Sequence, residues 1–278
     1  MSKLPSFLIK NIPKRINQSK IRNLISDESI HTVCESAKCP NLGECFSRNT
    51  LTFMILGDIC TRTCAFCGVK KGTLFPPDPD EPEKIAEAVK KLGLNYVVVT
   101  SVTRDDLPDY GASQFVRVIE ELKPLPVEVL IPDLCGEWEE LKKIVDAGPY
   151  VLNHNIETVP RLYKQIRPQA IYKRSLKLLK RAKELNSRLY VKSGFMVGLG
   201  ETDGEVFDLL QELKSVSCDI VTIGQYLPPS RNHAKPERFV DPSVFEEYKT
   251  EGEKLGLKVF SGPFVRSSYQ ASKIISLR

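Results

Sequence analysis

Six of the eight cysteines in this chain lie in one short stretch, in two groups of three with different spacing. The two groups are Cys34-x4-Cys39-x5-Cys45 and Cys60-x3-Cys64-x2-Cys67. A cubane 4Fe-4S cluster takes four ligands, so three cysteines on a tight loop hold three irons and leave the fourth open to a substrate, a cofactor or another protein donor. The spacing therefore predicts two 4Fe-4S clusters, each one thiolate short.

Two other uses of clustered cysteines fit this pattern less well. Disulfide frameworks belong mainly to short secreted domains, whereas this chain has 278 residues. Structural zinc usually takes close pairs of cysteines, often with histidine, but these cysteines form triplets and the chain has only three histidines. Iron-sulfur clusters remain the favoured interpretation.

Composition indicates a globular protein, with 41% hydrophobic and 27% charged residues. No stretch approaches the roughly 20 apolar residues that span a bilayer, and the N-terminus lacks the apolar run of a signal peptide. We therefore expect a cytoplasmic protein in a reducing compartment, without membrane contact. The net charge is +5, with basic and acidic residues interspersed. Such a balance does not require nucleic acid and also suits an acidic protein partner.

Short apolar runs alternate with helical patterns from Leu51 onward, which favours parallel strands with covering helices. The six candidate strands are 51–56, 95–100, 127–131, 150–153, 188–197 and 219–225. Six such units are two short of a full eightfold barrel. We expect an α/β fold, a partial (β/α)6 TIM-like barrel capped by N-terminal and C-terminal extensions. The expected division is an arm at 1–50, a barrel at 51–240 and an extension at 241–278.

Three helices are indicated by caps and by apolar periodicity. Capping boxes are expected at Asp80-x-x-Glu83 and Thr202-x-x-Glu205, each followed by buried positions at helical spacing. Gly93 should end the first of these helices. A third helix, near 174–185, should point Leu178, Leu179, Ala182 and Leu185 inward, and its basic outer face is interpreted as solvated.

The active site of a parallel barrel gathers at the carboxyl ends of its strands, and the second cysteine triplet follows the first strand. Polar residues after the other strands are further candidates. They are Thr100, Ser101, Arg104, Asp105, Asp106, Asn153, His154, Asn155, Glu157, Lys192, Ser193, Gln225 and Tyr226.

The string Cys60-Thr-Arg-Thr-Cys64-Ala-Phe-Cys67 resembles the signature of the radical S-adenosylmethionine superfamily. In such enzymes the open iron binds the methionine moiety of S-adenosylmethionine, and one electron then yields a 5'-deoxyadenosyl radical. The cofactor carries this chemistry, while the protein supplies binding and orientation. The resemblance implies this role for Cys60, Cys64 and Cys67.

The first triplet resembles the auxiliary-cluster motif of the lipoyl synthase family. The likeness continues in order through Thr52-Phe-Met-Ile-Leu-Gly57, Thr100-Ser-Val-Thr-Arg-Asp-Asp-Leu107, Asn153-His-Asn-Ile-Glu-Thr158, Lys192-Ser-Gly194, Met196-Val-Gly-Leu-Gly-Glu201, Ile223-Gly-Gln-Tyr-Leu227 and Arg266-Ser-Ser-Tyr269. It implies insertion of two sulfur atoms, at carbons 6 and 8 of an octanoyl chain on a carrier lysine. The auxiliary cluster is the implied sulfur donor, held by Cys34, Cys39, Cys45 and Ser268.

Further roles follow from this resemblance. Ser267, the preceding residue, is the alternative candidate for the serine ligand. Without the resemblance, both serines would be interpreted as residues of a polar turn. Implied contacts of S-adenosylmethionine are Ser101, Asn153, Asn155, Glu157 and Lys192. The Asn and Glu residues among them could instead be helix caps. Cys135 and Cys218 lie outside both triplets and are expected to be small buried hydrophobes, and His154 and His233 are expected to form hydrogen bonds.

The implied partners are octanoylated lipoyl carrier domains (2-oxoacid dehydrogenase E2 subunits and the glycine cleavage H protein), an electron donor such as ferredoxin or flavodoxin, and a cluster-rebuilding iron-sulfur carrier. Two other functions stay open. One is another radical sulfur-inserting enzyme, acting on a biotin precursor or on tRNA, although the tRNA version needs an RNA-binding module for which no length remains. The other is a two-cluster electron carrier, which needs neither six βα units nor incomplete cluster ligation.

Overall fold

The computed structural model describes residues 4–10, 19–27 and 30–273. Within these ranges one sheet of eight strands runs in chain order. The strands are β1 His31–Thr32, β2 Thr52–Ile55, β3 Val97–Ser101, β4 Val127–Leu130, β5 Val151–Asn153, β6 Tyr190–Val197, β7 Ile220–Gln225 and β8 Lys258–Gly262. Strands β2 to β8 pair in parallel, and only the short β1 pairs antiparallel, with β2.

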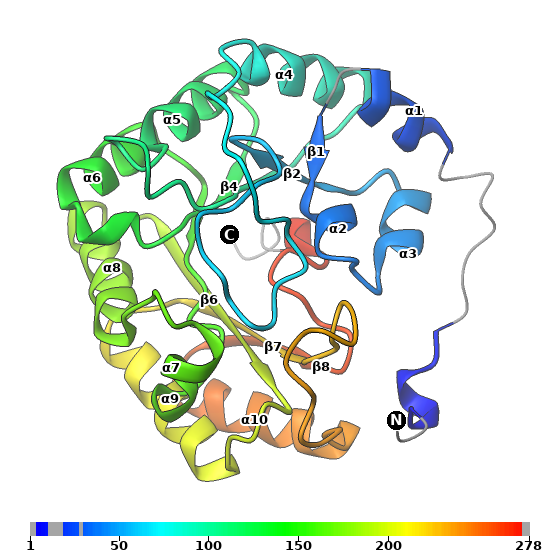
Figure 1. The fold of residues 1–278 in the computed structure, drawn as a ribbon. Helices are drawn as coiled ribbons and strands as arrows, with labels where there is room; N and C mark the ends of the chain where they lie inside the picture. The colour runs from blue at the N-terminus through cyan, green and yellow to red at the C-terminus, as the bar shows by residue number, and fades with distance from the viewer. Residues whose placement is uncertain (1–3, 11–18, 28–29, 274–278) are drawn as a thin grey trace.

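Helices surround the curved sheet on most of its circumference (Figure 1). The outer helices are α4 Glu81–Leu92, α5 Ala112–Glu121, α6 Trp138–Asp146, α7 Tyr163–Ile166, α8 Tyr172–Leu185, α9 Asp203–Ser215 and α10 Pro242–Lys254. The N-terminal helices α1 Ser19–Asp27, α2 Val33–Ser36 and α3 Leu42–Ser47 lie on the remaining side. Short 3-10 turns occupy Ser6–Leu8, Leu134–Gly136 and Pro160–Leu162.

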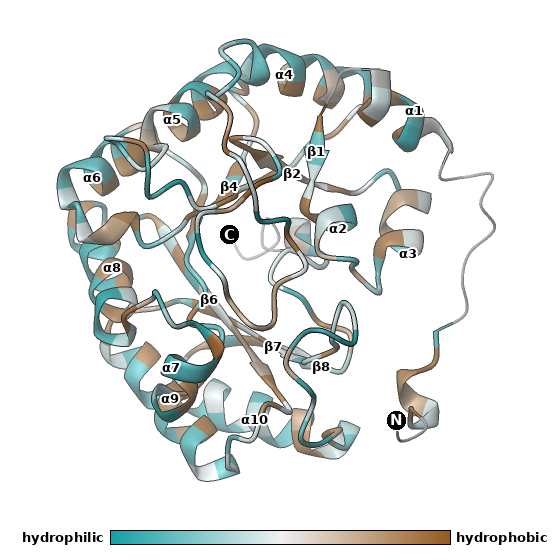
Figure 2. Cartoon of the chain, viewed as in Figure 1, coloured by the Kyte–Doolittle hydropathy of each residue, from teal (hydrophilic) through white to brown (hydrophobic). Residues whose placement is uncertain are grey.

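The strands are nearly continuous apolar runs because helices cover their outer face and side chains fill the interior. All four residues of β2 and all six of β7 are buried. The covering helices are amphipathic, and Figure 2 shows hydrophilic and hydrophobic residues alternating along them. In α4 the core face consists of Ile85, Ala88, Val89 and Leu92. None of the described helices is long and apolar enough to cross a membrane.

The expected α/β barrel is confirmed, and each of the six predicted strands is present, with ends that differ from the prediction by at most two residues. The structure differs after β7. Residues from Val240 were expected only to cap the barrel, but α10 and β8 continue the parallel sheet by one more unit. The run Lys258–Gly262 gave no strand signal because it has a single buried position, Val259.

The two predicted capping boxes have different outcomes. At the start of α9, Thr202 accepts from the backbone of Glu205 while the Glu205 side chain accepts from Thr202, as expected. The box at Asp80 is wrong, because Asp80 has φ −94° and ψ 0° rather than the extended backbone of an N-cap, and its side chain makes no capping bond. The Asp78 side chain accepts from the Asp80 backbone instead, at 2.9 Å.

Two further expectations concern helix ends and faces. Gly93 ends α4 in the left-handed conformation, with φ 65°, as predicted. In α8 the residues Leu178, Leu179 and Ala182 are buried, but Leu185 is 37% exposed. Leu185 is the last residue of that helix, where the chain turns away from the core.

Candidate active site at the carboxyl ends of the strands

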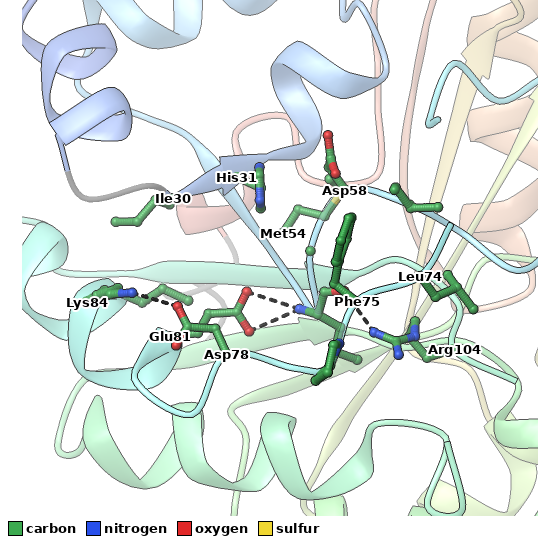
Figure 3. Close-up of a pocket in the computed structure, with 15 residues that line it drawn as sticks. Ile30, His31, Met54, Asp58, Leu74, Phe75, Asp78, Glu81, Lys84 and Arg104 are labelled. Carbon is green, nitrogen blue, oxygen red and sulfur yellow. Dashed lines mark hydrogen bonds and ion pairs between the residues drawn. The ribbon is translucent and has the colours of Figure 1, made fainter. Parts of the chain in front are cut away.

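The loop that carries the second cysteine triplet begins at a turn after β2, where Leu56 and Gly57 both have positive φ. The carboxylate of Glu81, in the first turn of α4, accepts from the Leu56 backbone N–H at 3.0 and 3.1 Å (Figure 3). Gln114 donates to the same carboxylate at 2.8 Å. Burial raises the pKa of Glu81, although these hydrogen bonds oppose the rise. Glu81 thus fixes the direction in which the cysteine loop leaves the sheet.

Loops from several other strands then hold the cysteine loop at the mouth of the sheet. The Thr61 backbone N–H and hydroxyl donate to the carbonyl of Thr103, after β3. The Ala65 N–H donates to the carbonyl of Ile166 in α7 at 2.9 Å. His233, in the loop after β7, lies 3.1 Å from the carbonyl oxygen of Cys67 through Nε2. The loop is therefore fixed from the β3, β5 and β7 sides of the barrel.

Arg62, between the first two cysteines of this triplet, has only 5% of its side chain exposed. Its guanidinium donates to Asp105 at 2.7 and 2.8 Å and to Asp133 at 2.6 Å. Burial alone would raise the pKa of Asp133, but the ion pair with Arg62 lowers it. Sequence reasoning missed Arg62 and Asp133. The sequence did offer one signal for them. A basic residue, Arg62, lies inside the cysteine motif, and the acidic residues Asp105 and Asp133 follow the next two predicted strands.

The three thiols of the second triplet lie near one another and are free. Burial raises the pKa of Cys67 to about 11, and the charges of Cys64 and Cys60 add to this rise. Burial also raises the pKa of Cys64, opposed by the nearby guanidinium of Arg167. Arg167 is a third residue that the sequence did not reveal, and it donates to the carbonyls of Asn155 and Ile156.

The first triplet spans α2 and α3. Cys34 lies in α2, Cys45 lies in α3, and Cys39 lies in the turn between them, where its N–H donates to the Cys34 carbonyl at 3.0 Å. Burial raises the pKa of Cys34 to about 12, and the charges of Cys39 and Cys45 add to it. The pKa of Cys45 rises to about 11 for the same reasons. Each triplet is therefore a compact group of free thiols.

The arrangement of these thiols fits cluster ligands. Among the residues that the structure describes, no three side chains of His, Cys, Asp and Glu converge closely enough to hold a single metal ion. A 4Fe-4S cluster needs less convergence, because each cysteine binds a different iron atom of the cluster. The two groups of three cysteines are therefore candidates for cluster ligands.

The C-terminal segment reaches the first triplet across more than 220 residues of sequence. The side chain of Asn41 donates to the Phe264 carbonyl at 2.7 Å, and the Tyr269 hydroxyl donates to Glu44 at 3.0 Å. Lys10 bonds Asn41 and Glu44 and lies over the rings of Phe264 and Tyr269. Arg266 lies within electrostatic reach of Cys39. The implied fourth-ligand segment is therefore next to the three cysteines.

The two serines of this segment have different surroundings. The Ser267 hydroxyl accepts from Asn153 at 2.7 Å and donates to Asn155 at 2.8 Å, so it points into the barrel. Ser268 has no side-chain hydrogen bond among the described residues, and it lines a cavity with residues 48–51, with residues 92–96 between α4 and β3, and with Ala271. This cavity lies at the amino end of β3, so the role of Ser268 as a fourth ligand stays a prediction.

The loops of the two triplets touch each other. A Cβ built on Gly68, next to Cys67, would lie 3.1 Å from the carbonyl oxygen of Ser36 and 3.0 Å from Pro229. Only a glycine fits this close approach without movement of its neighbours. The fold therefore brings both groups of cysteines to the same end of the sheet.

Four of the five residues implied for S-adenosylmethionine end or follow strands β3 and β5, and three of them, Ser101, Asn153 and Glu157, have unsatisfied or strained features. Ser101 Oγ and Asn153 Oδ1 are buried and lack a hydrogen-bond partner among the described residues. Glu157 has φ 70°, unusual for a residue with a side chain, and burial raises its pKa. Asn155 donates to Glu157 at 3.0 Å. Buried orphan acceptors and backbone strain of this kind are typical of ligand sites.

Lys192 differs from the expectation that its ammonium faces a ligand. It is 1% exposed, and its Nζ donates to the Glu128 carboxylate at 2.8 Å inside the barrel. Tyr96 donates to the same carboxylate at 2.9 Å and Asn153 at 3.1 Å. The charge of Lys192 is therefore balanced by the protein itself, and its contact with S-adenosylmethionine stays a prediction.

Of the cysteines and histidines expected to have no direct role at the site, Cys218 and His154 agree with expectation and Cys135 differs. Cys218 is 2% exposed in the core, as expected. Cys135 is not buried, because its positive φ turns the thiol toward Asp105 at 3.3 Å and toward Arg62 at 3.5 Å. His154 forms hydrogen bonds through both ring nitrogens, to Ile131 and Ser175, and burial lowers its pKa to about 4, so it stays neutral.

Comparison with known proteins agrees with this geometry. The Radical SAM superfamily matches residues 54–213. The lipoyl synthase of Caldanaerobacter subterraneus is 54% identical and covers 93% of this chain and of its own length. That of Caldicellulosiruptor saccharolyticus is also 54% identical, over 98% of this chain and 97% of its own. That of Chlorobium limicola is 51% identical, over 99% and 96%.

Solved structures show the same fold at low sequence identity. Methylornithine synthase has a TM-score of 0.58 at 16% identity, covering 89% of this chain and 76% of its own. SuiB of Streptococcus suis, solved bound to S-adenosylmethionine, has a TM-score of 0.61 at 11% identity, covering 79% and 54%. The cysteine loop at the mouth of the barrel, the superfamily match and the full-length relatives agree, and the chain belongs to the lipoyl synthase family of the radical S-adenosylmethionine superfamily.

Proposed function

We propose that this chain, a sulfur-inserting radical enzyme by its family, uses two 4Fe-4S clusters that divide the insertion of two sulfur atoms into an octanoyl chain. Cys60, Cys64 and Cys67 would hold the cluster that binds S-adenosylmethionine. Cys34, Cys39, Cys45 and Ser268 would hold the auxiliary cluster. The single observation that supports the division is that the C-terminal segment bonds Asn41 and Glu44, within the first triplet, while none of its hydrogen bonds among the described residues reaches the loop of the second.

When bound, the cluster of Cys60, Cys64 and Cys67 together with S-adenosylmethionine would supply a radical able to take hydrogen from an unactivated carbon, and the auxiliary cluster would supply sulfur. The residues of the chain have binding and positioning roles. The free acceptors Ser101 Oγ and Asn153 Oδ1 suit ribose hydroxyls, since each lacks a partner among the described residues. Asn155 and Glu157 would add further polar groups to this proposed binding surface, and the ion pair of Lys192 with Glu128 would lie beneath it.

The fourth ligand gives the auxiliary site its chemical character. A serine oxygen is a harder donor than a thiolate, and iron in a sulfide cluster prefers soft donors. The iron held by Ser268 would therefore leave more easily than the three held by cysteine. A site that must give up sulfur benefits from one weak bond of this kind. The adjacent Ser267, fixed by Asn153 and Asn155, would keep Ser268 in register.

The proposed substrate is an octanoyl-lysine on a lipoyl carrier domain, with carbons 6 and 8 as the reacting positions. Proposed partners are 2-oxoacid dehydrogenase E2 subunits or the glycine cleavage H protein, a ferredoxin or flavodoxin as reductant, and an iron-sulfur carrier that rebuilds the auxiliary cluster. We propose a cytoplasmic location. We also retain the division into an arm at 1–50, a barrel at 51–240 and an extension at 241–278, with β8 joining the extension to the sheet.

Two variants test the division of labour. Cys64→Ala should abolish 5'-deoxyadenosine release while leaving about four irons per chain in the auxiliary site. Cys39→Ala should still release 5'-deoxyadenosine but form no sulfur-containing octanoyl product. The measurements are iron and sulfide content, 5'-deoxyadenosine by chromatography, and mass spectrometry of an octanoyl-lysine peptide after anaerobic incubation with S-adenosylmethionine and dithionite.

The same measurements separate the other candidate functions. A two-cluster electron carrier would release no 5'-deoxyadenosine from S-adenosylmethionine. A radical enzyme for another substrate would release it without modifying the octanoyl peptide. Lipoyl product from the Cys39→Ala protein would mean that the first triplet is not the sulfur source.

A further inference from the structure

The segment that borders the S-adenosylmethionine cysteine loop has an unusual charge. Residues 158–183 contain nine lysines and arginines and no aspartate or glutamate. The whole chain has a net charge of only +5, so this segment holds a local excess of positive charge. The expectation that basic and acidic residues are interspersed throughout is wrong for this segment. This segment includes α7, the turn after it and most of α8.

Acidic side chains of neighbouring elements neutralise only part of this segment. Arg161 pairs with Glu205, Arg174 with Asp133, Arg181 with Glu184 and Lys183 with Asp219. Three exposed lysines, Lys164, Lys173 and Lys180, have no ion pair or hydrogen bond with any residue that the structure describes. A fourth, Lys177, contacts only the ring of Trp138, at 5.0 Å.

Three of these lysines share one face of a helix. Lys173, Lys177 and Lys180 are spaced four and three residues apart on α8, so they lie along one face of that helix. Lys164 lies in α7, the helix whose Ile166 carbonyl accepts from the cysteine loop. Ile171, 50% exposed, and Pro168 provide an apolar centre beside them. We call Lys164, Pro168, Ile171, Lys173, Lys177 and Lys180 the basic patch.

The basic patch is attached directly to the cysteine loop. The Ile166 carbonyl accepts from Ala65 N–H at 2.9 Å, and the Gln169 side chain accepts from Thr63 N–H at 3.1 Å. Thr63 and Ala65 flank Cys64 in sequence. Figure 1 shows α8 in the ring of helices and α7 drawn over α9 in this view. A protein on the patch would come close to the cysteine loop.

We propose that the basic patch is the docking site of an acidic one-electron carrier protein that reduces the cluster of Cys60, Cys64 and Cys67. The proposal rests on the cluster assignment under the proposed function. One electron leaves the reduced carrier and enters the cluster, with no bond formed or broken. Electron transfer slows steeply with distance, so the carrier must reach the cysteine loop. An octanoyl-bearing domain must instead deliver its chain to the mouth of the barrel.

The test compares two charge-reversed proteins of equal net charge. The first carries Lys164→Glu and Lys173→Glu in the patch. The control carries Lys90→Glu and Lys258→Glu, which lie in the last turn of α4 and at the start of β8, at the amino ends of the strands. Both pairs are exposed, so neither substitution removes core contacts.

Binding of an acidic flavodoxin to the reconstituted enzymes is measured by fluorescence anisotropy at low and high salt. The patch variant should bind about tenfold or more weakly than wild type at low salt, and the control should stay close to wild type. The difference should shrink at about 1 M salt, where screening is strong. Equal binding by patch variant and control would overturn the proposal.

A second measurement separates the carrier from other occupants. With flavodoxin as reductant, 5'-deoxyadenosine release by the patch variant should slow about as much as binding weakens. With dithionite, which needs no docking site, it should match wild type. An equal loss with dithionite would mean that the patch serves the octanoyl domain or the active site, and the proposal would be wrong. If the wild-type enzyme released no 5'-deoxyadenosine with dithionite, the proposed function would be contradicted. The binding measurement requires no turnover, so its result would stand separately.

Discussion

Ser267 and Ser268 are adjacent residues with different side-chain environments. The Ser267 hydroxyl bridges Asn153 and Asn155, while Ser268 has no side-chain partner among the described residues. Ser268→Cys should still assemble a cluster, because a thiolate is the better donor to iron. The stronger bond should hinder loss of that iron and lower the lipoyl product by about tenfold or more, with 5'-deoxyadenosine release retained.

Ser267→Cys is the matched variant, with the same change one residue away. It should disturb the hydrogen bonds to Asn153 and Asn155 and therefore reduce the affinity for S-adenosylmethionine. Product and 5'-deoxyadenosine from both variants, measured over a range of S-adenosylmethionine concentrations, distinguish the two roles. The same pattern in both variants would remove Ser268 from the auxiliary site.

The buried pair of Lys192 and Glu128 leads to a prediction about stability. Their side chains are 2% and 0% exposed, so removal of one charge leaves the other buried without its partner. Lys192→Met should lower the free energy of unfolding by about 3 to 5 kcal/mol, measured by urea denaturation. The double variant Lys192→Met with Glu128→Gln should recover much of that loss. A near-silent Lys192→Met would instead favour an exposed, ligand-binding lysine.

At the scale of elements, the N-terminus of α9 depends on one carboxylate. Arg161 and the capping bond with Thr202 lower the pKa of Glu205 from 4.5 to about 2. Because the folded-state pKa is the lower one, this carboxylate stabilises the fold above about pH 4.5, and the contribution is lost as the pH falls toward 2. Glu205→Gln should therefore cost about 1 kcal/mol at pH 7.

The measurement is the melting temperature of Glu205→Gln and wild type between pH 7 and pH 3. The gap between the two should be constant from pH 7 to about 5 and narrow at lower pH. Glu246→Gln serves as the control, since the Glu246 side chain is 70% exposed and makes only a 4.0 Å pair with Lys249. A gap that widens on acidification would contradict the assignment of the stabilising charge to Glu205.

Elements with a strong local signal were predictable, and those set by partners were not. Buried parallel strands are continuous apolar runs, so β2 to β7 could be located from sequence. The strand β8 has one buried residue, and β1 has two residues in all, so each forms only because a neighbouring strand is there to pair with it. The failed cap at Asp80 has the same origin, because the turn at Asp78 competes for the same backbone.

The candidate site divides in the same way. Cysteine spacing is local, and it identifies both triplets, one before and one after β2, without knowledge of the fold. The partnership of Lys192 with Glu128 joins β6 to β4, and that of Arg62 with Asp133 joins the cysteine loop to the loop after β4. Such pairs depend on strand order and register, which periodicity does not specify. Positions were thus predictable, and their partners were not.

At the scale of the whole molecule, both ends of the chain meet at the first triplet. Lys10 bonds Glu44 and lies 4.7 Å from the Phe264 ring centroid, and Tyr269 bonds the same glutamate. The parallel strands of the open barrel end at Gly262, before this contact begins. The proposed auxiliary site would therefore be assembled from segments near the two ends of the chain, while the loop of the second triplet is held by the barrel.

Removal of the residues after Pro263 tests this separation. The truncated protein should lose the auxiliary cluster and keep the other, so iron should fall from about eight to about four per chain. Release of 5'-deoxyadenosine should persist at saturating S-adenosylmethionine, because Cys60, Cys64 and Cys67 are held by loops after β3, β5 and β7. The affinity for S-adenosylmethionine should fall, because the truncation also removes Ser267 and its bonds to Asn153 and Asn155. Tyr269→Phe, which removes only the bond to Glu44, should keep both clusters. Full iron content in the truncated protein would mean that Cys34, Cys39 and Cys45 hold their cluster without the C-terminal segment.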